Sequence, residues 1–153
     1  MKNNFVLDAG IIRSSAICKD EKGMVCYHSN QLILNIAKNN HHIIITEIIM
    51  YQKYIPKIEE LKGSGEYVSF QPITFFMYLM KNSDIIKWDV VDNYINNDEY
   101  DKGDIEFVSL TIKNNAILST LDDRLINALS KADYQRRYII QYKRPENCLV
   151  DST

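Results

Sequence analysis

Short runs of consecutive apolar residues alternate along the chain with longer segments in which apolar residues recur every three or four positions. The continuous runs are typical of strands buried on both faces, and they occupy 4–7, 42–46, 116–119 and 138–142. The segments with helical spacing predict helices over 29–39, 47–61, 71–80, 84–95, 104–113 and 122–129. Pro56 is a candidate break inside the second of these helices. The polar stretches 63–65 and 96–103 predict loops.

Strands that alternate with helices indicate a parallel sheet with helices on both faces. We therefore expect a three-layer α/β/α fold with a central parallel sheet of four or five strands. A chain of 153 residues has the length of one such domain, so 1–153 is interpreted as a single domain. Ligands of such sheets bind beyond the carboxyl ends of the strands, which is where we look for candidate chemistry.

The composition narrows the class of protein without deciding it. A hydrophobic share of 46% and a charged share of 25% are ordinary for a globular domain. The formal net charge of −2 argues against a strongly basic coat for nucleic acid. No apolar run reaches the roughly 18 residues that a membrane span needs, and the segment before Asp8 lacks the pattern of a signal peptide. We therefore expect a cytoplasmic protein without a membrane partner.

The cysteines and histidines give little indication of a metal site. The cysteines are odd in number and form no CxxC pair, which predicts reduced thiols and leaves a zinc site as a remote alternative: Cys18, Cys26 and Cys148. The three histidines show neither HxxxH spacing nor a spacing to cysteine that suits a metal: His28, His41 and His42.

Acidic residues follow or flank the predicted strands. Asp8 follows the first strand, Asp122 follows 116–119, Asp104 begins the helix before that strand, and Glu47 begins the helix after 42–46. Two carboxylates 4 Å apart repel by about 4 kcal/mol at an effective dielectric of 20, so a convergent cluster needs protons or a divalent cation. Oxygen ligands suit Mg²⁺ or Mn²⁺. The alternative is that these acids only cap helices or favour their first turns.

Two segments resemble the motifs of PIN domains. Val6-Leu7-Asp8-Ala9-Gly10-Ile11-Ile12 is similar to the first motif, and the stretch from Asp104 through 116–125 is similar to the second half, with Thr120 and Asp122 in a Thr-x-Asp-x-x-Leu pattern. Weaker matches are 42–49 and 143–146. The resemblance implies a metal-dependent ribonuclease in which Asp8, Asp104 and Asp122 hold Mg²⁺ or Mn²⁺. It also implies a homodimer, and a cognate antitoxin if the protein is a toxin.

One position departs from the family pattern. The second acid of the family, a Glu, falls on Gln52 of this chain. An amide ligates metal more weakly than a carboxylate and cannot act as a base. We expect Glu47 to supply the missing carboxylate; the alternatives are a site with three acids, or reduced activity.

Neighbouring residues are candidates for supporting roles. Thr120 is expected to bond a carboxylate or the phosphate, or else to cap a helix, and Asp123 is expected to cap a helix or to support Arg124. The basic, tyrosine-containing C-terminal region is a candidate RNA-binding surface, with an ordinary solvated surface as the alternative: Arg124, Arg136, Arg137, Lys143 and Arg144. The aromatic residues at helical spacing are most simply core, with a dimer face as the alternative: Phe75, Phe76 and Trp88.

Three functions follow from these patterns, in order of preference. The first is a divalent-metal-dependent endoribonuclease, plausibly the toxin of a toxin–antitoxin pair. The second is a weakened PIN-like protein that binds RNA or a protein partner without cleaving it, because Gln52 replaces the expected Glu. The third is a phosphatase or receiver-like domain, which also has Asp after its first strand. Such domains require further acids or a lysine at positions where this chain does not clearly have them.

Overall fold

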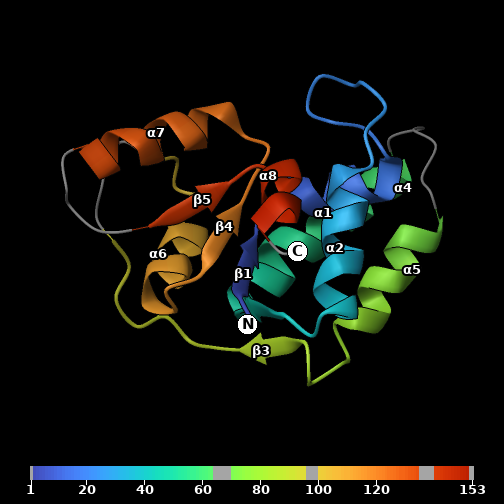
Figure 1. The fold of residues 1–153 in the computed structure, drawn as a ribbon, viewed down its shortest axis with the longest axis horizontal. Coiled ribbons are helices and arrows are strands. Elements are labelled where there is room, and N and C mark those ends of the chain that lie inside the picture. The colour runs from blue at the N-terminus through green and yellow to red at the C-terminus, as the bar shows by residue number, and fades with distance from the viewer. Residues whose placement is uncertain (1, 64–69, 96–99, 135–139, 152–153) are drawn as a thin grey trace.

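A single five-stranded parallel sheet forms the centre of the molecule. The computed structural model describes residues 2–63, 70–95, 100–134 and 140–151. The strands lie in the order β3-β2-β1-β4-β5, and each neighbouring pair is parallel. Their bounds are β1 Asn4–Leu7, β2 His42–Ile45, β3 Ile86–Trp88, β4 Ile117–Ser119 and β5 Gln141–Lys143. The predicted α/β class with a parallel sheet is confirmed (Figure 1).

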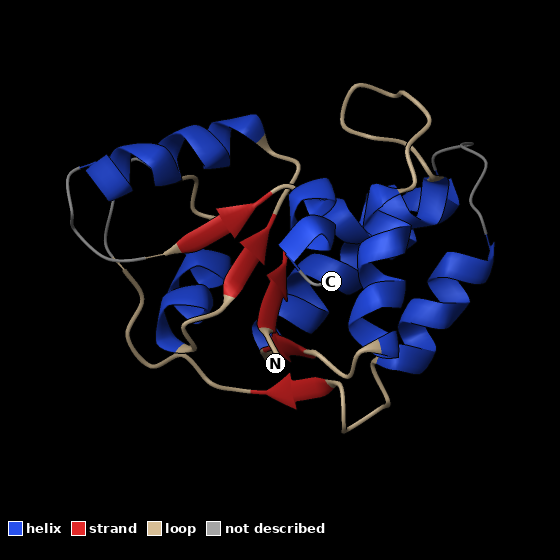
Figure 2. Ribbon diagram, in the orientation of Figure 1, coloured by secondary structure: helices blue, strands red, loops and turns tan. Residues whose placement is uncertain are grey.

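Helices flank both sides of this sheet. Figure 2 shows α6 and α7 on one side of the strands and α1, α2, α5 and α8 on the other, as the three-layer prediction requires. The bounds are α1 Ala9–Ile17, α2 His28–Lys38, α3 Glu47–Ile49, π-helix η1 Met50–Tyr54, α4 Ile55–Gly63, α5 Phe70–Leu79, α6 Ile105–Lys113, α7 Asp123–Tyr134 and α8 Pro145–Asp151. None of these described helices has the length and apolarity needed to cross a bilayer.

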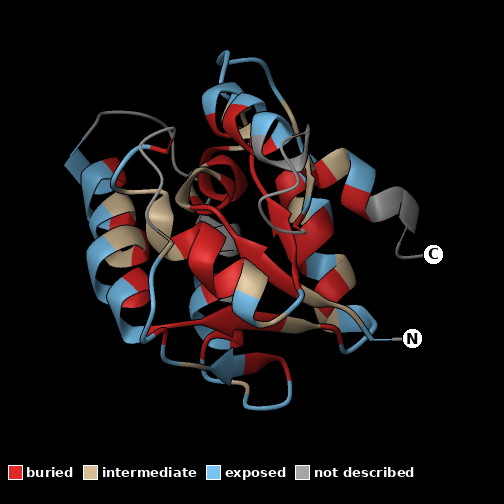
Figure 3. Cartoon of the chain, turned by 90° about the vertical axis from the view of Figure 1, so that its left-hand side faces the viewer, coloured by how far each residue is buried: buried red, intermediate tan, exposed pale blue. Residues whose placement is uncertain are grey.

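The central strands are buried because both of their faces are covered. Phe5, Val6 and Leu7 of β1 are at most 1% exposed, and Figure 3 shows the strands as the buried centre of the molecule. Phe5 pairs with Ile43 of β2 on one side and with Ile117 of β4 on the other. A strand covered in this way needs apolar residues at every position, which explains why the sequence shows continuous apolar runs instead of alternation.

The helix expected over 84–95 is wrong, because this segment contains the edge strand β3. Ile86 pairs with Ile43 and Trp88 with Ile45 of β2. The apolar residues of the segment happen to follow helical spacing, but β-branched residues also suit a strand, and pairing with β2 decides between the two. Trp88 is 52% exposed and therefore does not belong to the core, whereas Phe76, at 1%, does. The side chain of Phe75 lies outside the described residues.

Residues 47–63 form one continuous helical segment with a change of winding just before Pro56. Thr46 accepts a hydrogen bond from the backbone N–H of Ile49 and so caps the segment, as expected. In η1, the backbone N–H of Ile55 donates to Met50, five residues earlier. Pro56 has no N–H to donate to Gln52, and its ring would crowd that carbonyl in a regular α-helix. The π-turn relieves this conflict without ending the helix.

The sequence pattern did not reveal α1 or α8. Helix α1 begins directly after Asp8, whose side chain accepts a hydrogen bond from the backbone N–H of Ala9. Most residues of this helix are buried, Ser14 and Ser15 among them, so no clear polar face marks it in the sequence. Strand β5 begins at Gln141, and the earlier part of the predicted last strand, 138–139, lies outside the described residues.

Candidate metal centre

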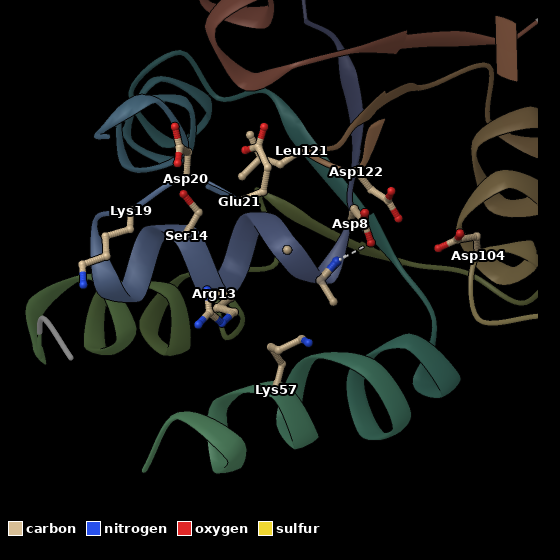
Figure 4. Close-up of a pocket in the computed structure, with 12 residues that line it drawn as sticks. Asp8, Arg13, Ser14, Lys19, Asp20, Glu21, Lys57, Asp104, Leu121 and Asp122 are labelled. Atoms are coloured by element: carbon tan, nitrogen blue, oxygen red, sulfur yellow. Dashed lines mark hydrogen bonds between the residues drawn. The ribbon is translucent and has the colours of Figure 1, made fainter. Parts of the chain in front are cut away.

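Two neighbouring strands and one helix bring three aspartates together. Asp8 directly follows β1, Asp122 lies three residues beyond β4, and Asp104 precedes the first residue of α6. Because β1 and β4 are adjacent and parallel, their carboxyl ends meet at the same edge of the sheet. One carboxylate oxygen from each aspartate lies within 4.8 Å of the other two. Figure 4 shows the three carboxylates directed toward a common point.

Asp8 is the buried member of the cluster. Its residue is 8% exposed, and its two oxygens accept hydrogen bonds from the backbone N–H of Ala9 at 2.8 Å and from the Thr120 hydroxyl at 2.6 Å. Burial raises the pKa of Asp8 above its ordinary value, the two hydrogen bonds lower it, and the charge of Asp122 raises it further. The result is a carboxyl group whose pKa is raised but whose orientation is fixed from two sides.

Asp104 has the most strongly perturbed acidity in the cluster. Burial and the negative charges of Asp8, Asp122 and Asp101 raise its pKa to about 7. Although Asp104 precedes α6, its side chain makes no capping hydrogen bond within the described structure. The carboxylate therefore faces the other acids instead of closing its own helix.

Thr120 connects two members of the cluster. Its hydroxyl donates to Asp8 and accepts the backbone N–H of Asp122 at 3.0 Å. Asp122 also begins α7, since its Oδ1 accepts the backbone N–H groups of Arg124 and Leu125. Asp122 therefore caps a helix and also faces the other two acids. The helix cap and the acid cluster, given as alternatives from the sequence, do not exclude each other at this residue.

The donor set fits a hard divalent cation. Ligand oxygens about 2.1 Å from Mg²⁺ or Mn²⁺ lie at most about 4.2 Å from one another, so the observed spread of up to 4.8 Å needs only a small closing movement or a bridging water. Carboxylate oxygens are the donors that these ions prefer. The pKa values of Asp8 and Asp104 are raised first by burial and then by the neighbouring carboxylates, and a bound cation would favour the charged form of both groups.

The structure does not bring Glu47 into this cluster. Glu47 is exposed and lines a separate hollow with Trp88, Val90 and Tyr94, beyond the ends of β2 and β3. It is the first residue of α3, where the helix dipole favours an acid, and the start of the helix directs it toward β3. The expected replacement of the missing carboxylate by Glu47 therefore has no geometric support.

Gln52 does lie beside the cluster. A hollow of about 280 Å³ is lined by Asp8 and Asp104 on one side and by Gln52, Lys57 and Glu60 of the η1–α4 segment on the other. The position at which the family pattern places a Glu thus lines the same hollow as two of the aspartates, but it carries an amide. Glu60 reaches the same hollow and pairs with Lys57 at 3.7 Å, a position that the spacing of the acids did not single out.

The predicted RNA-binding residues have different environments. Arg124 is exposed and lies 3.5 Å from Asp101. Asp123, for which a helix cap or a partner of Arg124 was expected, is the first residue of α7 and pairs with Arg144. Arg144 is bound by three carboxylates, those of Glu21, Asp123 and Glu146, and so connects the elements that carry them. Lys143 ends β5 and is half-buried. Arg136 and Arg137 lie outside the described residues.

No family model matches the chain. No curated protein matches it either. Membership in the PIN family therefore stays a prediction from the motifs.

The three cysteines are free thiols in the structure.

Proposed function

We propose that the protein is a divalent-metal-dependent endoribonuclease of PIN-like type, with Asp8, Asp104 and Asp122 as metal ligands. The observation that carries the proposal is the convergence of these three carboxylates within 4.8 Å at the carboxyl edge of a parallel sheet. An acid cluster of this kind is electrostatically unfavourable alone and becomes favourable around a doubly charged ion.

The residues around the cluster would have different roles in the hydrolysis of a phosphodiester. A bound Mg²⁺ or Mn²⁺ supplies Lewis-acid activation of water and neutralises charge that develops on the phosphate. Asp8 is held in place by Thr120 and Ala9 and so fixes one side of the site. Asp104 would hold the ion as a carboxylate, directly or through the water molecule that it orients for attack. Lys57 lines the hollows beside the cluster and is placed to attract the phosphate.

A cleavage assay with a matched pair of variants tests the proposal. Asp8→Asn keeps the size of the side chain but removes its charge, so we expect the metal-dependent cleavage of single-stranded RNA to fall by about a hundredfold or more. Asp92→Asn, which changes an exposed aspartate outside the cluster, is the control and should cleave like the wild type. Cleavage is measured with Mn²⁺ and with EDTA. Equal cleavage in both, or full activity of Asp8→Asn, would contradict the proposal.

A second function is favoured by Gln52. Since this amide lines the same hollow as two of the aspartates where the family pattern has a Glu, a protein that binds RNA or a protein partner without cleaving it is the alternative. The same assay distinguishes the two, because the alternative predicts Mn²⁺ binding without RNA turnover. The roles as a toxin with a cognate antitoxin, the homodimer and the cytoplasmic location stay predictions from the sequence.

A further inference from the structure

A groove of about 370 Å³ runs from the aspartate cluster along the outer side of α1 (Figure 4). We name it the α1 groove. Its floor is α1, with Gly10 and Ser14, and the three aspartates lie at one end. Lys57 of α4 lies along one wall, and the loop after α1 places Asp20 and Glu21 along the opposite wall. Two further basic residues line the groove, Arg13 of α1 and Lys19 of the loop after it. Its volume is in the range of pockets that hold small organic ligands.

Ser14 is an unsatisfied polar group in this groove. The residue is 3% exposed, and its Oγ has no hydrogen-bond partner among the described residues. The neighbouring Ser15 behaves as a helical serine usually does, donating to the backbone carbonyl of Ile12 at 2.8 Å. Figure 4 shows the side chain of Ser14 directed toward Asp20. Since buried hydroxyls are nearly always paired, the hydroxyl of Ser14 indicates a ligand that completes it.

The charges of the two walls restrict that ligand. A simple anion would be attracted to the basic residues of the groove but repelled by its acidic wall and by the aspartate cluster. A simple cation would meet the opposite conflict. A molecule with an anionic part and a separate set of N–H donors satisfies both walls, and a nucleotide with an amino-bearing base has this combination: its phosphate is anionic, and the exocyclic amine of cytosine or adenine donates to carboxylates.

The acidic wall is held in place before any ligand arrives. Asp20 accepts the backbone N–H groups of Lys22 and Met24, each at 2.9 Å. Glu21 accepts a hydrogen bond from Arg144 at 2.7 Å. Carboxylates fixed in this way lose little freedom on binding, which favours selection between bases over general attraction.

We propose that the α1 groove holds the nucleotide next to the scissile phosphate and selects an amino-bearing base over uracil. The phosphate lies toward Lys57, and the amino group of the base lies toward Asp20, Glu21 and the hydroxyl of Ser14. The proposal rests on the proposed ribonuclease function, because the groove leads away from the metal centre. It adds a substrate preference that the cluster of three aspartates does not itself provide.

Gly10 allows the groove to be filled without disturbing the fold. A Cβ added at Gly10 meets no described atom within 4 Å, so a larger side chain has room to extend into the groove. Gly63, at the end of α4, has equally open surroundings and does not line the groove. Gly10→Leu therefore blocks the groove, and Gly63→Leu is the matched control.

The test measures RNA binding separately from cleavage. Fluorescein-labelled heptamers of A, C and U are titrated by anisotropy in Ca²⁺, with a gel to check that the RNA stays intact, and cleavage is measured separately in Mn²⁺. We expect the wild type and Gly63→Leu to bind the A and C heptamers at least about fivefold more tightly than U. We expect Gly10→Leu to weaken the A and C complexes by about tenfold or more, while its Mn²⁺ titration stays like that of the wild type.

Each outcome decides the proposal. Equal affinity of Gly10→Leu and the wild type, equal affinity for A, C and U, or no RNA binding at all would overturn it. If the wild type cleaves RNA but binds A, C and U equally, or binds RNA no better than Gly10→Leu, the ribonuclease function is supported and the role of the α1 groove is rejected. Selective, groove-dependent binding without cleavage would overturn the ribonuclease function and support the groove. Glu21→Gln should bring the affinities for C and U closer together if the wall selects the base.

Discussion

The raised pKa of Asp104 links the candidate metal site to the stability of the folded protein. Its pKa is about 7 in the folded chain, against an ordinary value of 3.8. Between these two values the folded state keeps a proton that the unfolded state has lost, so stability falls as the pH rises through this window, and the whole penalty is present above pH 7. A divalent cation replaces the proton and removes the penalty.

Thermal unfolding of the wild type and Asp104→Asn measures this effect. Without divalent ions, the Tm of the wild type should fall more between about pH 5.5 and about pH 8 than that of Asp104→Asn. Mn²⁺ should raise the Tm of the wild type more at the higher pH. The comparison with the variant is needed because burial lowers the pKa of His41, which destabilises the protein as the pH falls below 6.5 and so acts in the opposite direction. The same pH dependence in both proteins would argue against a protonated Asp104.

Among the secondary-structure elements, α8 and the loop after α1 depend on one side chain. The guanidinium of Arg144 donates to Glu146 at 2.9 Å, to Glu21 at 2.7 Å and to Asp123 at 3.3 Å. It therefore joins the start of α8, the loop after α1 and the start of α7. Three charge-assisted bonds in a partly buried position stabilise more than an isolated surface pair does.

Two arginine variants test this connection. Arg144→Ala should lower the free energy of unfolding by about 2 kcal/mol, because it leaves three carboxylates without their common partner. Arg124→Ala removes an 82% exposed side chain with one partner at 3.5 Å and should change stability by less than about 0.5 kcal/mol. Denaturant unfolding of both variants gives the comparison. Equal stability would mean that Arg144 is not the connection described here.

Some helices and strands could be predicted from the sequence pattern, and others could not. The buried run 42–46 predicts β2 because a strand covered on both faces is apolar at every position. Strand β3 could not be predicted with the same rules, because its residues also fit helical spacing and only pairing with β2 decides. Helix α1 escaped detection since its polar residues are buried as well. Asp8 and Asp122 could be predicted because they follow strands, and Asp104 because it begins a helix in the motif that ends in Asp122. The direction of Glu47 depends on how its helix begins, which the sequence pattern does not give.

In the whole molecule, strand order explains why residues distant in the sequence share one site. Strands β1 and β4 are neighbours although β2, β3 and the helices from α1 to α6 lie between them in the sequence, and this adjacency places Asp8 beside Asp122. Asp104 reaches them because α6 packs against β1 and β4. The motifs predicted the three acids, but only the structure shows that Gln52 shares a hollow with Asp8 and Asp104 and that Glu47 lines a different one.

A crystal structure of the protein grown with Mn²⁺ tests the central claim most directly. We expect one anomalous difference peak between β1, β4 and α6, about 2.1 Å from carboxylate oxygens of Asp8, Asp104 and Asp122 or connected to them through water. The peak should be absent from crystals of Asp8→Asn grown under the same conditions. A Mn²⁺ peak elsewhere, or none at a saturating concentration of the ion, would contradict the account of these three aspartates as a metal centre.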